Sequence, residues 1–280
     1  GTPGPSFISN FPVDFGLTKK PAASQNWYTG LRLLGSKYLA TNTSGDANTD
    51  AEMAWDYNNG FVDGNFFGNS ANQGWMWKRH AGFDVVAYKS DELASGLVNH
   101  SLGKIPEMIW FKSRDANQGW GVWHKGLNGG SNSDQYYLRL DSSNSETGGS
   151  SNTDRPLASA PTSTSISLLS TSSFANYSTH KYIAMLFASV DGISKVGYYT
   201  GNGVSNPASG QTITTGFAPR FLMVKNITNS NDWFVIDTVR GWSSGNDKFL
   251  KLNSNDPHYN HDFGAPTSNG FTLPDDNGAY

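Results

Sequence analysis

The chain has 280 residues with a net charge of −3, and only 15% of its residues are charged while 13% are aromatic. This balance argues against a nucleic-acid-binding protein, which needs clustered Lys and Arg to neutralise phosphates. The absence of cysteine excludes disulfides, thiolate zinc sites and cysteine nucleophiles, and no apolar run approaches the roughly 18 residues of a membrane helix.

One pattern opens three successive segments of the chain. Each copy reads as a proline, a spacer, an apolar run and a lysine, followed at a matching distance by a tryptophan. The three sets are Pro12, Lys19 and Trp27; Pro106, Lys112 and Trp120; and Pro219, Lys225 and Trp233. Because the internal offsets agree, we interpret the three segments as copies of one unit.

Each copy continues with an aromatic-leucine strand and a polar turn residue. These are Tyr38-Leu39 with Asn42, Tyr137-Leu138 with Asp141, and Phe249-Leu250 with Asn253. A second hairpin follows in two copies, at 75–88 and 182–198, but the third copy reaches Tyr280 before any counterpart. A third unit without those strands would expose a bare sheet edge, so we expect more of the chain, or another chain, to cover it.

Short apolar runs punctuated by Gly, Asn and Ser are typical of antiparallel β-sandwiches. The sequence therefore predicts an all-β protein of tandem small antiparallel β-sandwich units of a jelly-roll or lectin-like kind. The expected ranges are 6–95, 98–205 and an incomplete 210–280. The repeated aromatics are expected to fill the space between the sheets rather than to bind a ligand.

The third copy contains the motifs of the first half of the unit. They are the run from Gly216 to Lys225, Asp-Thr-Val-Arg-Gly ending at Gly241, Phe249-Leu250 with Asn253, and Asn-Gly-Phe-Thr-Leu from Asn269 to Leu273. This unit resembles a repeat of structural and tail-fibre proteins from marine and cyanobacterial phages. The resemblance implies lectin-like sandwiches on a virion, commonly as trimers, and it brings no known ligand residues.

Catalytic patterns are missing from the sequence. There is no Gly-x-Ser-x-Gly elbow, no His-Glu-x-x-His and no phosphate-binding glycine loop. A glycan hydrolase would need two placed carboxylates, and the candidates lie in turn-like polar segments, at Asp256, Asp262, Asp275 and Asp276. We read them as solvated turn residues, and we expect no catalytic residues.

No cofactor or metal is expected. Calcium is an alternative that we do not favour, because the runs at 229–232 and 253–256 offer oxygen ligands but match no complete calcium loop. His258 and His261 lie beside Asp262, yet one loop without a rigid frame does not make a zinc site.

Large aromatics that do not recur in every copy are the candidates for binding a partner, since recurring ones serve the fold. Trp242, His258 and Tyr259 lie in polar loops of the third copy, and Trp123 and Trp55 are less clear cases. An aromatic face beside amide and carboxylate groups suits a sugar ring or a protein. The alternative is that these side chains pack inside their own units.

Three functions follow from these observations. The first is a non-catalytic fibre or adhesin segment of a virion that presents loops to a host-surface glycan or protein. The second is a purely structural spacer or decoration array, and a weaker third is a polysaccharide depolymerase. The expected partners are the host surface, other virion proteins and further copies of the chain, with an extracellular or virion location.

Overall fold

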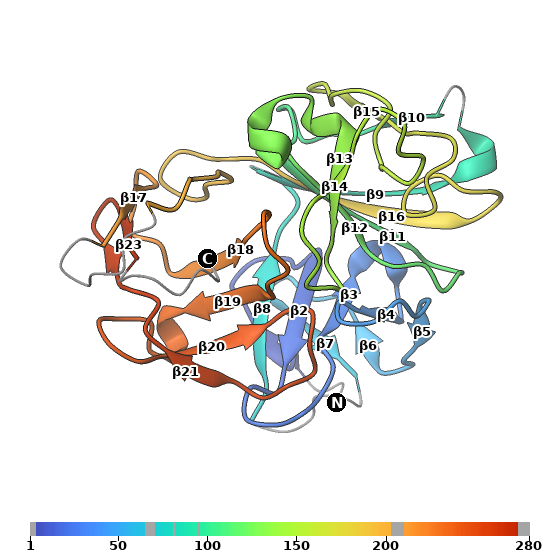
Figure 1. Ribbon diagram of the computed structural model, residues 1–280. Coiled ribbons are helices and arrows are strands. Elements are labelled where there is room, and N and C mark those ends of the chain that lie inside the picture. Colours follow the sequence, from blue (N-terminus) through green and yellow to red (C-terminus); the bar gives the residue numbers. More distant parts are fainter. Residues whose placement is uncertain (1–3, 65–70, 81, 94–95, 203–209, 274–280) are drawn as a thin grey trace.

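The computed structural model describes residues 4–64, 71–80, 82–93, 96–202 and 210–273, and these residues form an all-β structure of antiparallel sheets (Figure 1). The predicted fold class is confirmed. Among the described residues, helical structure is limited to short 3₁₀ turns, which include η1 (Arg32–Leu34), η2 (Ser90–Glu92), η4 (Leu127–Gly130), η5 (Ser133–Gln135) and η7 (Thr238–Arg240). In the described parts of the chain, no helix is long and apolar enough to cross a membrane.

Three larger sheets form the body of the molecule, and each contains the opening strands of one copy of the repeat. The first sheet has the order β5 (Asn48–Thr49), β4 (Lys37–Ala40), β3 (Tyr28–Leu31), β2 (Phe15–Lys19) and β8 (Gln73–Trp77). The second has the order β14 (Thr147–Gly148), β13 (Tyr136–Arg139), β12 (Gly121–His124), β11 (Met108–Ser113), β16 (Lys181–Phe187) and β9 (Phe83–Lys89). The third has the order β18 (Phe221–Lys225), β19 (Trp233–Asp237), β20 (Asp247–Lys251) and β21 (Tyr259–His261). We refer to the copies with these sheets as units 1, 2 and 3.

A small sheet accompanies each larger one. These sheets are β1 (Phe7–Ile8), β7 (Gly60–Asp63) and β6 (Met53–Ala54); β10 (Leu97–Asn99) and β15 (Ser165–Ser167); and β17 (Thr212–Thr214), β23 (Gly270–Thr272) and β22 (Pro266–Thr267). In unit 1 the two layers pack closely, because a Cβ atom on Gly16 of β2 would lie 2.5 Å from the Phe61 ring of β7. Glycine at this position is what allows the sandwich to close.

The three units share a core. One cluster of buried residues includes the recurring tryptophan and leucine of every unit, namely Trp27, Leu39, Trp120, Leu138, Trp233 and Leu250. Figure 1 shows the three sheets arranged around this common centre. The units are therefore parts of one body rather than separate beads on a chain.

The tryptophans after the opening strands occupy equivalent positions. The main-chain N–H of each donates to the side chain of its unit's polar turn residue: Trp27 to Asn42 at 2.9 Å, Trp120 to Asp141 at 3.3 Å and Trp233 to Asn253 at 2.9 Å. Each indole N–H then donates to a main-chain carbonyl of another unit: Trp27 to Lys251 at 2.8 Å, Trp120 to Ala40 at 2.9 Å and Trp233 to Arg139 at 2.9 Å. Unit 1 thus bonds to unit 3, unit 2 to unit 1 and unit 3 to unit 2, which closes a ring.

The recurring lysines repeat this cyclic pattern. Their ammonium groups donate to carbonyls of the same neighbouring units: Lys19 to Asn255 at 2.9 Å, Lys112 to Ser44 at 3.3 Å and Lys225 to Ser143 at 3.2 Å. Burial lowers the pKa of each of the three lysines to about 8. Nearby aspartates raise the pKa and so offset part of this shift.

One strand crosses an expected boundary. β9 lies within the range 6–95 that the sequence assigned to unit 1, but it pairs with β16 along seven residues and so belongs to the sheet of unit 2. The physical reason is that β16 is apolar and buried at every residue except Lys181, so its second edge also needs a partner strand, and the mostly apolar β9 supplies it. Residues 75–88, which the sequence indicated as one hairpin, therefore contribute β8 to the first sheet and β9 to the second.

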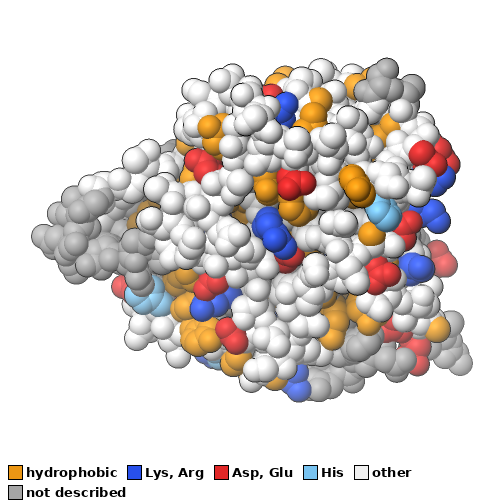
Figure 2. Space-filling model, turned by 45° about the vertical axis from the view of Figure 1, so that its right-hand side comes forward, with side chains coloured by type: hydrophobic (Ala, Val, Ile, Leu, Met, Phe, Trp, Pro, Cys, Tyr) orange, Lys and Arg blue, Asp and Glu red, His pale blue; other side chains and the backbone are white. Residues whose placement is uncertain are grey.

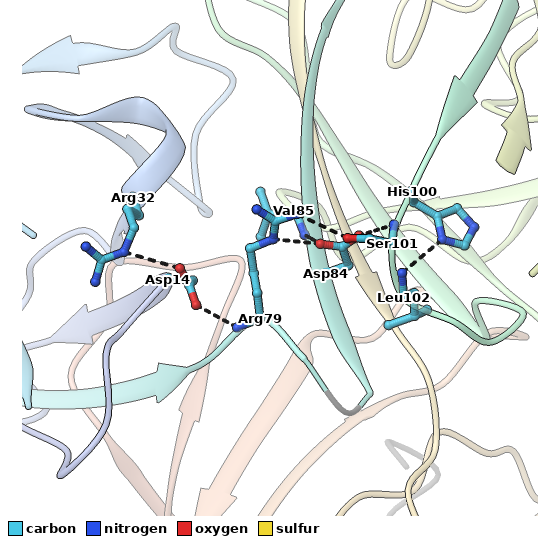
Figure 3. A network of polar contacts seen from close by, with 8 residues as sticks. All are labelled: Asp14, Arg32, Arg79, Asp84, Val85, His100, Ser101 and Leu102. Carbon is cyan, nitrogen blue, oxygen red and sulfur yellow. Dashed lines mark hydrogen bonds and ion pairs between the residues drawn. The ribbon is translucent and has the colours of Figure 1, made fainter. Parts of the chain in front are cut away.

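A polar network joins the first two sheets at this crossing (Figure 3). Asp14 accepts hydrogen bonds from Arg32 and from the main-chain N–H of Arg79, whose side chain donates to Asp84 of β9 at 2.7 Å. Burial alone would raise the pKa of Asp84, but hydrogen bonds from Ser101, Arg79 and Val85 lower it overall. The carboxylate is therefore held ionised between the units.

The indole bonds between units predict a specific loss of stability. Trp120→Phe removes the indole donor of the Ala40 carbonyl and leaves it with one long hydrogen bond, from the main-chain N–H of Thr43 at 3.4 Å, so it costs about 0.5–1.5 kcal/mol beyond the lost packing. Trp123→Phe is the matched control, because Trp123 is also buried but its indole N–H has no partner among the described residues. Urea unfolding should show Trp120→Phe to be the more destabilising by that margin, and equal losses would contradict a role for the indole bond.

The buried lysines predict a pH dependence. Each lysine loses its proton near pH 8 in the folded chain but near pH 10.5 in the unfolded chain, so the unfolded chain binds more protons between these values. The free energy of unfolding should therefore rise from pH 8 to pH 10 by about 2 kcal/mol per lysine. Above that window the trend reverses, because burial raises the pKa values of Tyr88 and Tyr182.

Chemical unfolding at pH 8 and pH 10 tests this dependence. Lys112→Met should remove about 2 kcal/mol of the rise, since it deletes one of the three groups. Lys181→Met replaces an exposed lysine at the start of β16 and should leave the rise unchanged. An identical rise in Lys112→Met would show that the lysine does not titrate in this window.

Candidate functional site

A cavity of about 320 Å³ opens on the second sheet, between β13, β14 and two loops that approach them. Its lining residues are Tyr137, Leu138, Arg139, Asn144, Ser145, Thr147, Asp154 and Phe174. This volume lies at the lower end of the range for sites that hold small molecules. The cavity thus has room for about one sugar ring or a short side chain.

Two aromatic side chains form its apolar part. The rings of Tyr137 and Phe174 have their centroids 5.2 Å apart at an angle of 47°, so they meet as two sides of a corner. The guanidinium of Arg139 lies 5.9 Å from the centre of the Phe174 ring and is paired with Asp141 at 3.0 Å. The arginine is therefore held in place while it faces the cavity.

The remaining lining groups are polar. Asp154 is exposed, and one of its carboxylate oxygens accepts a hydrogen bond from Ser173 at 3.1 Å. Burial and the Asp154 charge raise the pKa of Tyr137, so its hydroxyl stays protonated at neutral pH. With Asn144, Ser145 and Thr147 at the rim, the cavity offers donors and acceptors for several hydroxyl groups.

The rim loop is fixed by the neighbouring unit. Lys225 donates to the carbonyl of Ser143, and the main-chain N–H of Glu146 donates to the carbonyl of Ile227 at 2.8 Å. Asp141, where the loop begins, accepts from the N–H of Trp120. The ring of units therefore holds the loop that lines the cavity.

The cavity lies at a position that recurs in the other units. The ladder pairs Tyr137–Thr147, Phe249–Tyr259 and Tyr38–Asn48 occupy the same place in the three sheets. Tyr259, a residue expected from the sequence to bind a partner, is thus the counterpart of a residue that lines the cavity in unit 2.

The ladder pair Phe249–Tyr259 of unit 3 forms a different surface from its counterpart at the cavity of unit 2. Tyr259 is 42% exposed, stacks on Phe249 with ring centroids 5.6 Å apart and lies 4.9 Å from the Lys251 ammonium. A hydrogen bond to Asp256 raises the pKa of Tyr259. Unit 3 therefore presents a partly exposed aromatic ring beside a cation and a carboxylate.

Trp242 is not part of an exposed surface. It is 2% exposed and belongs to a buried cluster of unit 3 that contains Phe234, Phe249, Phe263 and Phe271. The expectation that Trp242 joins His258 and Tyr259 in binding a partner does not fit this position, because its ring fills the interior between β19, β20 and β23. Trp123 and Trp55 are likewise buried, at 3% and 5% exposure.

His258 is half-buried and serves the ring of units. Its main-chain N–H donates to the carbonyl of Pro21 in unit 1 at 2.7 Å. Burial, with Lys248 and Arg240 nearby, lowers the pKa of its imidazole. The side chain is therefore neutral at pH 7, and it lies next to Tyr259 without sharing its exposure.

The oxygen-rich runs considered for calcium have other bonds. Asn253 accepts from Trp233 and donates to Asp232, and the carbonyl of Asn255 accepts from Lys19. Asp262 accepts from the N–H of Gly264 in a local turn, whereas Asp275 and Asp276 lie outside the described residues. Across the described ranges, no group of three or more His, Asp or Glu residues is placed to hold a metal ion.

Sequence reasoning missed the residues of the cavity. Tyr137 was expected in the core because it recurs in the aromatic-leucine strand, and it is buried there at 9% exposure although it also lines the cavity. Phe174 directly follows the Ser- and Thr-rich stretch 162–173, where unit 2 departs from the repeated pattern. That departure was the available signal, because a loop that differs from its counterparts is free to serve a partner.

Figure 2 shows one face of the molecule, on which acidic and basic side chains are interspersed among uncharged ones.

Comparisons with known proteins give one match. A family model described as "Domain of unknown function (DUF7483)" matches residues 18–280. Neither the curated proteins nor the solved structures contain a match to the chain.

Two aromatic residues of unit 3 predict losses of stability of different size. Trp242→Ala should destabilise the protein by about 3–5 kcal/mol, because it empties a buried site. Tyr259→Ala removes a partly exposed ring and should cost about 1 kcal/mol or less. Thermal and urea unfolding of both variants measure this, and a small loss for Trp242→Ala would contradict its packed position.

Proposed function

We propose that this chain, which belongs to the DUF7483 family, is a non-catalytic glycan-binding segment whose main site is the cavity on the second sheet. The observation that carries the proposal is the combination of an aromatic corner with polar groups of both kinds. Tyr137 and Phe174, which are 9% and 7% exposed, offer the accessible edges of their rings to the C–H groups of a sugar, while Arg139, Asp154 and Asn144 can bond its hydroxyls.

The small number of carboxylates at the cavity favours binding of a sugar without its hydrolysis. Among the described residues that line the cavity, Asp154 is the one carboxylate, and Asp141 nearby is committed to Arg139 and Trp120. Glycoside hydrolysis commonly needs two carboxyl groups on opposite sides of the scissile bond. The described part of the cavity therefore supports holding a sugar better than cleaving one.

The biological setting of this proposal is a virion fibre or adhesin that meets a bacterial surface. It is supported by the resemblance of the repeat to units of phage structural and tail-fibre proteins. A host-surface polysaccharide is the partner that best matches this setting and the cavity, and other virion proteins would then be its neighbours in the assembly.

A purely structural array is the second candidate. The burial of Trp242 and the use of His258 in the ring of units favour it, since both residues serve packing. In that role the chain would act as a spacer or decoration on a larger assembly.

A microarray of bacterial surface polysaccharides, followed by calorimetry with a polysaccharide that binds, tests the first proposal. Asp154→Asn and Asn144→Ala should each weaken binding by about tenfold, which corresponds to about 1.4 kcal/mol. Asp191→Asn, the same chemical change at an exposed position remote from the cavity, should bind as the unchanged protein does.

Two results would contradict the proposal. Full binding by both cavity variants would place the site elsewhere, and a lack of binding to any polysaccharide would favour the structural array. Release of reducing ends from a bound polysaccharide, lost in Asp154→Asn, would show that the segment is catalytic.

A further inference from the structure

Among the described residues, no strand pairs with the outer edge of β18, whereas the equivalent strands of the other units are paired on both sides. β2 lies between β3 and β8, and β11 lies between β12 and β16, but β18 pairs only with β19 among the described residues. The same strand of the repeat is thus internal twice and at an edge once.

The register identifies the groups that this edge presents. The N–H of Thr238 donates to the carbonyl of Arg220 at 3.0 Å, and β18 continues antiparallel to β19 from there. Because main-chain groups alternate in direction, those of Leu222 and Val224 face β19 while those of Phe221, Met223 and Lys225 face away. In β11 the equivalent residues, Met108, Trp110 and Lys112, bond to β16.

A second segment lacks the same partner. β9 pairs with β16 along its length, whereas its sequence counterpart, residues 192–198, forms no ladder with described residues beyond one isolated bridge between Val190 and Ser194. Ile193 and Tyr198 of this segment are 69% and 58% exposed. The described residues therefore include counterparts of both strands that flank β16. These are β18, which corresponds to β11, and residues 192–198, which correspond to β9. A strand that corresponds to β16 is not paired with either of them in the described part of the chain.

The strands that pair with the outer edges of β2 and β11, namely β8 and β16, also contact a neighbouring unit. Trp77 of β8 packs edge-on against Phe221 of unit 3 at 6.1 Å, and Gln73 donates to Asp237 at 3.1 Å. Phe187 of β16 stacks with Phe83, which contacts Phe15 of unit 1. By the cyclic order of the units, a strand on β18 would lie at the seam between units 3 and 2.

The charge at the beginning of β18 differs from its counterparts. Asp14 and Glu107 accept a hydrogen bond from the N–H that follows β8 or β16, at Arg79 and Ser189. The equivalent residue in unit 3 is Arg220, which is exposed and forms no ion pair with the described residues. An acidic residue after an incoming strand would complement it.

We propose that the outer edge of β18 binds an antiparallel strand of another polypeptide chain, apolar like β16 and followed by an acidic residue. Addition of a strand to an exposed sheet edge is a common mode of protein recognition, because main-chain bonds supply affinity and side-chain pockets supply selectivity. This surface is separate from the glycan cavity, so either proposal can fail without the other.

The test uses the 280-residue chain and a synthetic peptide with the sequence of residues 181–189 carrying Ser189→Asp. Hydrogen exchange followed by NMR should show the amides of Phe221, Met223 and Lys225 slowed at least tenfold by saturating peptide. The amides of Leu222 and Val224, which already face β19, should change little. No slowing at the three outward amides would overturn the proposal.

Matched peptides separate strand pairing from general stickiness. In β16 the main-chain groups of Ile183 and Met185 face β11, since Arg114 donates to the carbonyl of Lys181, and those of Ala184 and Leu186 face β9. N-methylation at Ile183 and Met185 should therefore weaken binding at least tenfold more than N-methylation at Ala184 and Leu186. Equal effects would contradict pairing with β18.

A charge reversal tests the role of Arg220. Arg220→Glu should weaken binding of the peptide that ends in aspartate about threefold to tenfold and strengthen binding of a Ser189→Lys peptide. Because Arg220 is exposed, this variant should keep the stability of the unchanged protein. Affinities that do not depend on either charge would remove the acidic residue from the proposed partner.

Discussion

An indole N–H donated across a unit boundary is the interaction on which the rest of the structure depends. Trp27, Trp120 and Trp233 each bond to a carbonyl in a different unit, and the three bonds run in one direction around the molecule. A buried indole N–H without an acceptor is costly, so each of these tryptophans needs the neighbouring unit to supply its carbonyl. The ring is thus closed by specific bonds as well as by apolar packing.

The buried lysines add a second cyclic set of bonds with a different physical character. Each ammonium is removed from water and compensated by carbonyls of its own and the neighbouring unit, as for Lys112 with Ser113 and Ser44. Loss of Lys112, for example, would remove a hydrogen-bond donor from carbonyls in two units. Burial of Thr41, Leu140 and Leu252 at equivalent positions completes the centre of the ring.

The cavity on unit 2 combines ring contacts that recur in all three units with a surface that differs between them. Its rim begins at Asp141 and is held by Lys225 and Ile227 of unit 3, which are part of the cyclic pattern. Its outer wall includes Asp154 and Phe174, which lie before and directly after the stretch 162–173 where unit 2 departs from the repeat. A rigid frame with one altered loop is a common arrangement for binding sites. In the same way, the third unit departs from the others at β18, where it leaves an edge open.

The sequence alone was sufficient to determine the all-β class, the three copies and the equivalence of Trp27, Trp120 and Trp233, because these depend on local spacing and on side chains that recur. Only the tertiary structure decided that the units share a core, that β9 crosses into the second sheet and that Trp242 is buried. Those facts depend on contacts between residues far apart in the chain, such as Trp27 with Lys251 and β9 with β16. A recurring residue such as Tyr137 looks the same in sequence whether its ring ends in a core or at the wall of a cavity. The difference arises from what packs beside it, which here is Phe174 from a distant loop.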